Sequence, residues 1–336
     1  MDMQARQIVP FDVFGMRDDV RVSTMVRVGD KGWTCGLCPL DRQARVVSPG
    51  DLGAQAVFVA DMIAAVFARA GFGANDVAKL VIYHAASSKQ ETQALLASFQ
   101  RRFPKGPVLV PVAVPYFYYA GMLLEVDAYA DASLLPRAGS VSGSVQARQG
   151  QDLTYVAASA ETREGVYDAL KAAGFPPSNP LLQNEFWAEH SGDTKPLAHS
   201  GVMLPAGSDG HVVDLLLSDQ CPVVHDDAQP FMSVRAAGDL LVFTASHPEP
   251  DLSLVDQTRA VMRQLDAGLS RHGLTWAHVV KVSAPYVGGG TEDDLHQNLK
   301  IRHSYHVRPG PASTGLPVRA FVQTGTRICV QLLAHR

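Results

Sequence analysis

The chain from residue 308 to residue 334 contains two apolar runs with a turn between them. Proline and glycine residues precede the first run, and Thr324-Gly325 separates it from the second. In the second run, Ile328, Val330 and Leu332 recur at every second position, which is the period of a strand that buries one face. The pattern predicts a strand, a hairpin turn at Thr324-Gly325 and a closing strand.

The first third of the chain predicts a mixed set of elements with the same ending. Apolar spacing and turn residues predict, in order, strands over 22–28 and 33–37, a helix over 52–70, a strand over 79–84 and a helix over 90–101. Gly71 follows the first helix and fits a C-terminal cap. Residues 107–130 then contain a valine-rich run, the dipeptide Ala120-Gly121 and a second strand-like run. The predicted order is ββαβαββ.

The last third of the chain repeats this order in the same register. We expect strands over 232–234 and 240–245 and a helix over 252–271 that ends at Gly273. Four pairs of identical residues are each separated by 202 positions: Gln55 and Gln257, Gly71 and Gly273, Val77 and Val279, Lys79 and Lys281. This common spacing indicates a duplication.

Residues 138–222 predict a shortened and diverged copy of the same unit. Strands are expected over 142–147 and 153–158, a helix over 162–173, and a closing strand over 211–217. No middle strand is evident over 175–195, which is rich in proline, asparagine and charge. We predict repeats over 17–132, 138–222 and 228–336, with an unrelated linker domain as the alternative for the middle segment.

Composition favours a soluble protein with a small-molecule partner. The 336 residues are 46% hydrophobic and carry a net charge of −4, which gives no general electrostatic reason to bind nucleic acid or an anionic membrane. The N-terminus has no apolar signal-peptide core, and no run of about 18 apolar residues is evident. Four cysteines are too few and too scattered for a disulfide framework. We expect a cytoplasmic protein with no nucleic-acid or membrane partner.

Two motifs resemble the RidA family, also called the YjgF or reactive-intermediate deaminase family. They are Gly50-Asp51, Gln55, Gly71 and Asp76-Val77-Ala78-Lys79, and then Gly121, Leu123, Glu125 and Ala128. The resemblance covers the outer thirds of the chain well and the middle weakly. It implies an α/β (α+β) fold of tandem ββαβαββ repeats, with a trimer-like or pseudo-trimeric core, helices outside and ligand pockets at the interfaces. The protein would be a monomeric pseudo-trimer or a homo-oligomer.

The resemblance also implies a site. In catalytic members an arginine on the penultimate strand holds the substrate carboxylate, and a glutamate on the last strand positions the hydrolytic water. Counting back twelve positions from the turn glycine of each repeat leads to Leu109, Ala198 and Ser313, none of which is arginine. The glutamate position is assigned to Glu125 in the first repeat, to Asp214 in the middle one and to Cys329 in the last one.

The implied activity is that of a hydrolase or lyase, resembling enamine and imine deaminases, with a carboxylate-activated water and a small unsaturated substrate. Two alternatives stay open: a non-catalytic metabolite-binding protein of the same fold, and an enol ether hydrolase resembling the chorismatases. Cys329 could act as a nucleophile only if a neighbouring base lowered its pKa.

Further residues are candidates for substrate binding. Ser313 and Thr314 follow a proline/glycine loop, where hydroxyl groups could hold an anion or a carbonyl, and Arg308 could replace the missing arginine as an anion clamp. Asn298 and Tyr116 could line an interface pocket. Cys35 belongs to the motif Cys35-Gly-Leu-Cys38 and is included as a pocket residue.

No metal or cofactor site is predicted. Cys35 and Cys38 have the spacing of redox or zinc sites, but no second pair completes a tetrahedral zinc site. His296, His303 and His306 fall on or near one helical face without a carboxylate at fixed spacing, so we expect them on a solvated face.

Overall fold

The computed structural model describes residues 6–16, 20–136, 144–175, 178–188, 200–205, 208, 210–218 and 223–336. Ala198 and Cys221 lie outside these residues. The described strands and helices fall into three successive units, 23–131, 145–218 and 232–335, which are called the first, middle and third repeats below.

The first repeat has the ββαβαββ order that the apolar spacing predicts. Its elements are β2 Ser23–Val28, β3 Lys31–Thr34, α1 Leu52–Arg69, β4 Val77–His84, α2 Lys89–Arg102, β5 Val108–Ala113 and β6 Leu124–Asp131, with a 3₁₀ turn at Ala74–Asp76. Asp51 caps α1 by accepting a hydrogen bond from the backbone N–H of Ala54. Gly71 follows α1 with a φ of 75°, the left-handed conformation that glycine adopts without strain, so the predicted cap is confirmed.

The third repeat has the same order. Its elements are β13 Met232–Ala237, β14 Leu240–Ser246, α4 Leu254–Arg271, β15 Val279–Tyr286, α5 Glu292–Tyr305, β16 Ala312–Pro317, a short β17 Ala320–Phe321 and β18 Cys329–His335, with a 3₁₀ turn at Trp276–His278. Ser253 caps α4, 202 positions after Asp51, and Gly273 has a φ of 70°. An extra strand precedes each of these two repeats: β1 Arg6–Pro10 pairs with β2, and β12 Val224–Gln229 pairs with β13.

The middle repeat contains β7 Val145–Gln149, β8 Leu153–Ala160, α3 Arg163–Ala172, β9 Leu182–Trp187, β10 Ser200–Met203 and β11 His211–Ser218. The expectation of no middle strand over 175–195 is wrong, because β9 lies there and pairs with both β10 and β11. The apolar pattern that marks a buried strand is missing from this segment because Gln183 and Glu185 are polar yet buried. The Gln183 amide donates to Glu185 Oε1 at 2.6 Å, and the Trp187 indole donates to Glu185 Oε2 at 3.0 Å.

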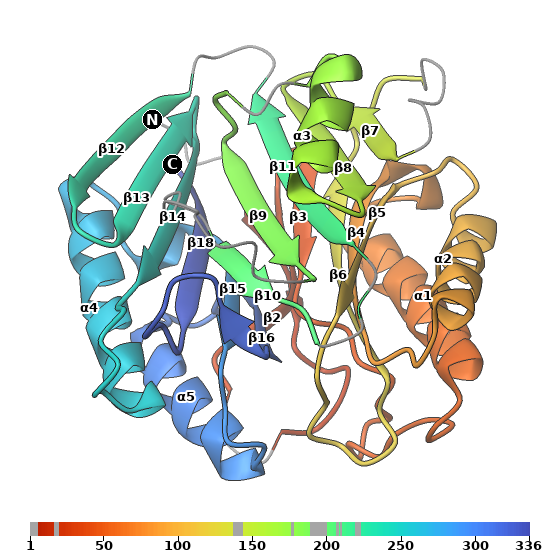
Figure 1. The fold of residues 1–336 in the computed structure, drawn as a ribbon, viewed down its shortest axis with the longest axis horizontal. Coiled ribbons are helices and arrows are strands. Elements are labelled where there is room, and N and C mark those ends of the chain that lie inside the picture. Colours follow the sequence, from red (N-terminus) through yellow and green to blue (C-terminus); the bar gives the residue numbers. More distant parts are fainter. Residues whose placement is uncertain are drawn as a thin grey trace.

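The strands form the centre of the molecule and the helices cover its outside (Figure 1). α1 and α2 lie on one flank, α4 and α5 lie on the opposite flank, and α3 covers strands of the middle repeat (Figure 1). Among the described residues, α1 is the one helix long and apolar enough to cross a membrane by length and composition. One face of α1 packs in the core through Val59, Ile63 and Phe67.

The closing strands are not paired as the sequence analysis predicts. In the third repeat the strand order is β18-β15-β16, and the first and middle repeats likewise have β6-β4-β5 and β11-β9-β10. A strand lies between the two runs in each case, so Thr324-Gly325 is not a hairpin turn. Gly325 nevertheless has a φ of 83°, as the equivalent turn glycines Gly121 and Gly210 have left-handed φ values of 80° and 74°.

The repeats join through their strands. β16 of the third repeat runs parallel to β2 of the first, and β17 of the third pairs with β10 of the middle repeat. β5 of the first repeat lies beside β7 and β8 of the middle repeat, where the backbone N–H of Leu109 donates to Gln146 Oε1 at 3.0 Å. One hydrophobic core therefore contains residues of all three repeats, among them Val81, Leu182 and Val280.

The residues repeated at a spacing of 202 make equivalent contacts. The buried amide of Gln55 donates to the carbonyl of Gly121 at 2.8 Å and accepts from the N–H of Leu123 at 2.8 Å. Gln257 donates to the carbonyl of Gly325 at 2.8 Å and accepts from the N–H of Arg327 at 2.8 Å. Each glutamine thus ties a helix start to the turn before the last strand, and this contact explains the repeated glutamine.

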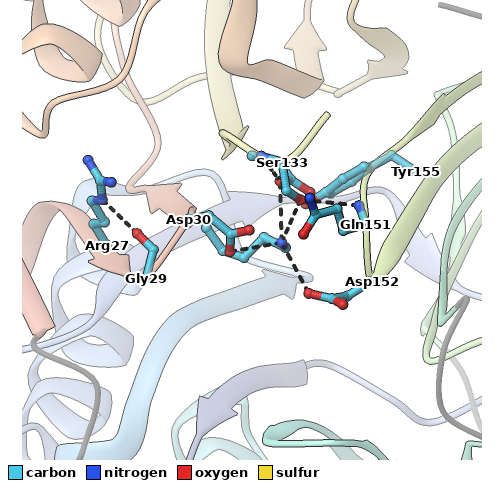
Figure 2. Close-up of polar contacts among 9 residues, drawn as sticks. Arg27, Gly29, Asp30, Ser133, Gln151, Asp152 and Tyr155 are labelled. Carbon is cyan, nitrogen blue, oxygen red and sulfur yellow. Dashed lines mark hydrogen bonds and ion pairs between the residues drawn. The ribbon is translucent and has the colours of Figure 1, made fainter. Parts of the chain in front are cut away.

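A polar cluster also joins the first and middle repeats where their β2–β3 and β7–β8 turns meet (Figure 2). The amino group of Lys31 lies 2.9 Å from Asp30, 3.3 Å from Asp131 and 3.8 Å from Asp152, and it donates to the Ser133 hydroxyl at 3.1 Å. Lys31 and Asp131 are buried, so this contact fixes the two turns against each other.

Candidate functional site

A cavity of about 100 Å³ lies between the first and third repeats. Most of its wall is apolar. The N-terminal part of the chain contributes Phe11, Phe14, Met16, Val20 and Val22, and the loop 117–122 contributes another part. Its polar side chains and cysteines are Cys35, Cys38, Tyr118, Tyr119, Glu125, His303 and Ser313. The cavity therefore brings together three of the residues predicted from sequence: Glu125, Cys35 and Ser313.

Glu125 lies on β6 between two neighbouring strands, with Leu124 and Val126 buried against the helices on the other face of the sheet. Its side chain lies directly against Gly36. A Cβ atom at residue 36 would come within 1.7 Å of Glu125 Oε1, so only glycine leaves room for this carboxyl group. The local sequence thus places an acid in the cavity with little freedom to move.

The environment of Glu125 favours its protonated form. Burial, and then the negative charge of Asp127, raise the pKa of Glu125 to about 8, against an opposing effect of Lys281. The Cys38 thiol hydrogen-bonds with this carboxyl group, while burial raises the pKa of Cys38 well above its ordinary value. A carboxylic acid held neutral near pH 7 can donate a proton to a ligand.

Thr314 lies on the opposite face of β16 from Ser313, because successive strand residues alternate. Its hydroxyl donates to Asp127 Oδ1 at 2.5 Å, and Lys281 lies 2.8 Å from the same oxygen. Lys281 also donates to the Thr314 hydroxyl at 2.6 Å and to the carbonyl of Thr34 at 2.8 Å. Thr314 is therefore part of a buried ion-pair network next to the cavity and does not line it.

Asp214 occupies a different kind of position from Glu125. Strand pairing places Asp214 opposite Asn184 on β9, as Asp127 lies opposite Val81 on β4 and Gln331 lies opposite Ser283 on β15. Asp214 is therefore the equivalent of Asp127, and Val212 is the equivalent of Glu125. The sequence analysis assigned Asp214, two residues after Val212, to the position of Glu125. The error arose because β11 follows Gly210 more closely than β6 follows Gly121.

The carboxylate of Asp214 is fully buried and paired. Lys79 donates to its two oxygens at 2.7 and 3.0 Å, and the Asn184 amide donates to Oδ2 at 3.2 Å. Lys79–Asp214 joins the first repeat to the middle one, as Lys281–Asp127 joins the third repeat to the first. These contacts explain the repeated lysines.

Cys329 lies in another cavity, of about 40 Å³, formed by all three repeats. Tyr83, Asn184, Phe186 and Gln331 are among its other lining residues. Burial raises the pKa of the Cys329 thiol to about 12, and no base among the described residues opposes this effect. The condition for a nucleophilic Cys329 is therefore not met.

The helix α5 differs most from expectation. Arg308 is exposed and does not line the Glu125 cavity, whereas Arg302, which the sequence analysis missed, is fully buried beside it. Its guanidinium Nε donates to Asn298 Oδ1 at 2.5 Å, and Nη1 donates to the Ser313 hydroxyl at 3.4 Å. The four-residue spacing of Asn298 and Arg302 on a predicted helix was the available signal.

The three histidines of this region are buried, so the expected solvated face is wrong. His296, His303 and His306 are 7%, 6% and 2% exposed, and the ring of His306 packs against those of Trp276 and His303. Burial lowers the pKa of His303 to about 2 and that of His306 to about 3, which keeps both rings neutral. Tyr116 contacts Tyr118 at the edge of the cavity but does not line it. Among the described residues, no group of three or more acidic, histidine or cysteine side chains could hold a metal ion.

No family model and no curated protein matches this chain. Solved structures are similar to part of it. A member of the YjgF/YER057c/UK114 family from Mycobacterium tuberculosis has 22% identity over 38% of this chain and 100% of its own, with a TM-score of 0.32. TdcF of E. coli with bound serine has 19% identity over 38% of this chain and 99% of its own, with a TM-score of 0.32. The yeast protein YEO7 has 18% identity over 38% of this chain and 98% of its own, with a TM-score of 0.33.

The chain is built from repeats of one arrangement. Their ββαβαββ order is complete in the first and third repeats, and the described part of the middle repeat has β9, β10 and β11 in the same arrangement. The cavity with Glu125 combines β6, the last strand of the first repeat, with β16 of the third repeat.

Proposed function

We propose that the cavity between the first and third repeats hydrolyses a small enamine or imine, with Glu125 as the acid and base. The observation that carries this proposal is the carboxyl group of Glu125, buried in a cavity wall and kept protonated near neutral pH. The cavity size limits the substrate. Since a cavity of about 150 Å³ accommodates benzene, one of about 100 Å³ accepts a molecule of roughly four to six heavy atoms.

The steps follow from one carboxyl group that changes its protonation state. Protonated Glu125 donates its proton to the β-carbon of the enamine, which gives an iminium ion and a carboxylate. The carboxylate then accepts a proton from water as the water oxygen bonds to the iminium carbon. The resulting carbinolamine expels ammonia, with the hydroxyl proton passing to the nitrogen. The sum is enamine plus water giving a carbonyl compound plus ammonia, and Glu125 is restored.

The surroundings support this role. The largely apolar wall keeps the acid protonated, and Cys38 orients it. Ser313 provides a hydroxyl group on the wall contributed by the third repeat. The product ammonia requires no charged leaving group, which suits an apolar cavity.

The test is ammonia release from 2-aminoacrylate formed in situ, measured for the wild type and Glu125→Gln. The amide keeps the shape of the side chain but cannot exchange a proton, so turnover should fall by about 10² or more while the circular dichroism and melting temperature stay near those of the wild type.

The matched control is Glu185→Gln, the same change at a buried glutamate of the middle repeat that does not line the cavity. Its turnover should stay within about twofold of the wild type. Equal turnover in wild type and Glu125→Gln, or no ammonia release above the uncatalysed rate by the wild type, would rule out the proposed reaction.

A further inference from the structure

A cavity of about 240 Å³, called the junction cavity below, lies where the β2–β3, β7–β8 and β13–β14 turns of the three repeats meet. None of its described lining residues lines the Glu125 cavity, so the proposed reaction does not use it. Val28, Leu153 and Leu240, one from each repeat, form part of an apolar wall. Since a cavity of about 150 Å³ accommodates benzene, the junction cavity has room for a molecule of roughly ten heavy atoms.

The lining of the junction cavity is acidic. Asp30, Asp152 and Asp239 line it, one from the turn of each repeat. Lys31 is the one lysine or arginine among the described lining residues, and its amino group lies 2.9 Å from Asp30 and 3.8 Å from Asp152 (Figure 2). The same amino group lies 3.3 Å from Asp131, which is fully buried. Four carboxylates around one ammonium group leave an excess of negative charge, which attracts a cation.

A tryptophan in the same wall has a donor without an acceptor. Trp33 lines the junction cavity, is 3% exposed, and lies two positions after Lys31 on β3, so the two side chains project from the same face of the strand. The other two indole N–H groups donate to carboxylates, at 3.0 Å from Trp187 and at 2.8 Å from Trp276. No described residue accepts from the N–H of Trp33. A buried indole N–H normally has an acceptor, which points to a ligand that supplies one.

We propose that the junction cavity binds a small amino alcohol. The ammonium group of this ligand donates to the carboxylates of Asp30, Asp152 and Asp239. Its hydroxyl oxygen accepts from the N–H of Trp33, a group that can only donate. An anion is disfavoured, because the amino group of Lys31 already has three oxygen atoms within 3.3 Å. The site is separate from the Glu125 cavity, so it does not depend on the proposed reaction.

Three matched probes separate the two recognised groups. The compound trans-4-aminocyclohexanol carries both groups, cyclohexylamine lacks the hydroxyl, and trans-1,4-cyclohexanediol replaces the ammonium group by a second hydroxyl. By calorimetry with the intact chain at pH 7, the amino alcohol should bind at least tenfold more tightly than the diol and at least threefold more tightly than the amine. Equal affinity for the amino alcohol and the diol, or no binding of the amino alcohol, would overturn the proposal.

The indole N–H resonances locate the binding. The chain has three tryptophans, so a nitrogen-15 spectrum contains three such signals, each identified by a tryptophan-to-phenylalanine substitution. Addition of trans-4-aminocyclohexanol should shift the signal of Trp33 and leave those of Trp187 and Trp276 in place, because these two already donate to carboxylates elsewhere. No shift of the Trp33 signal at a saturating concentration would overturn the proposal.

Substitutions test the two contacts one at a time. The double variant Asp152→Asn, Asp239→Asn removes two charges and should lower the affinity for the amino alcohol at least tenfold. Its matched control is Asp168→Asn, Asp251→Asn, at two exposed aspartates outside the cavity, which should bind as the wild type does. Trp33→Phe removes the N–H and should bind the amino alcohol and the amine equally. Unchanged affinity in the first double variant would overturn the proposal, and it decides together with the probe ratios if Trp33→Phe does not fold.

Discussion

The interface between the first and third repeats and the interface between the third and middle repeats are built from equivalent strands, but they differ in chemistry. The first has Glu125 in a cavity of about 100 Å³, whereas the second has Cys329, at the equivalent strand position, in one of about 40 Å³. An acid with a raised pKa is thus present at one interface and a protonated thiol at the other. Repetition of a fold therefore does not repeat its chemistry.

The buried ion pairs follow a different distribution. Lys79–Asp214 and Lys281–Asp127 link two of the three interfaces. At the third interface, strand pairing puts Leu182 at the lysine position and Gln331 at the aspartate position. Both charges are missing there together, as expected if a single buried charge without its partner is not tolerated. The ion pairs join neighbouring repeats, whereas Glu125 places an acid in the cavity.

The largest expected effect is on the ion pair that lies away from the candidate site. Lys79→Met leaves Asp214 buried without its cation, so the free energy of unfolding should fall by about 3–5 kcal/mol. Urea unfolding at pH 7 measures it. The double variant Lys79→Leu, Asp214→Gln copies the uncharged interface and should recover most of the loss. A loss below about 1 kcal/mol in Lys79→Met would show that this pair is not needed for the assembly.

The second expected effect is on the pH dependence of stability. Because the pKa of Glu125 is raised from about 4.5 to about 8, the folded chain binds more protons than the unfolded chain between these values. The associated stability is complete below about pH 4.5 and is lost as the pH rises through about 8. Relative to Glu125→Gln, the wild type should therefore lose up to about 1.4 kcal/mol per pH unit across this window. Urea unfolding of both proteins at pH 5, 6, 7 and 8 measures this, and parallel curves would contradict it.

The third expected effect concerns the space beside Glu125. Gly36→Ala places a methyl group where Glu125 Oε1 now lies, so the carboxyl group must move and ammonia release should fall about tenfold. Gly53→Ala, in the first turn of α1, is a control in which the added Cβ comes no closer than 3.4 Å to another residue. Similar turnover for the two alanine variants would mean that the position of Glu125 is not critical.

The smallest expected effect distinguishes the two cavities directly. Cys329→Ala should change ammonia release by less than about twofold, because this thiol is protonated and lies outside the Glu125 cavity. Cys38→Ala removes a hydrogen bond that favours ionised Glu125, so the upper pKa of its pH–rate profile should move upward. A large loss in Cys329→Ala with an unchanged profile in Cys38→Ala would reverse the choice of cavity.

Local features of the sequence determined the elements and much of their order. Helix caps at Gly71 and Gly273, the two long helices and the ββαβαββ pattern depend on neighbouring residues, since capping and apolar periodicity act within a few positions. Glu125 could also be chosen from the sequence, mainly through the resemblance of the closing motif Gly121, Leu123, Glu125 and Ala128. The repeated glutamines and lysines were visible as a spacing, although their contacts were not.

The tertiary structure alone decided which strands pair and which polar groups share a cavity. The expected hairpin at Thr324-Gly325 was wrong because β15 lies between β16 and β18. β9 was missed because its buried polar residues are hydrogen-bonded to partners such as Tyr167. Asp214 was misaligned because β11 follows its turn glycine more closely than β6 does, and strand pairing is needed to show this difference. Arg302 was not singled out from the sequence, because one arginine on a polar helix is common. Its complete burial and its contacts with Asn298 and Ser313 are visible only in the tertiary structure. Burial and long-range pairing create these properties, and neither is encoded in the spacing of neighbouring residues.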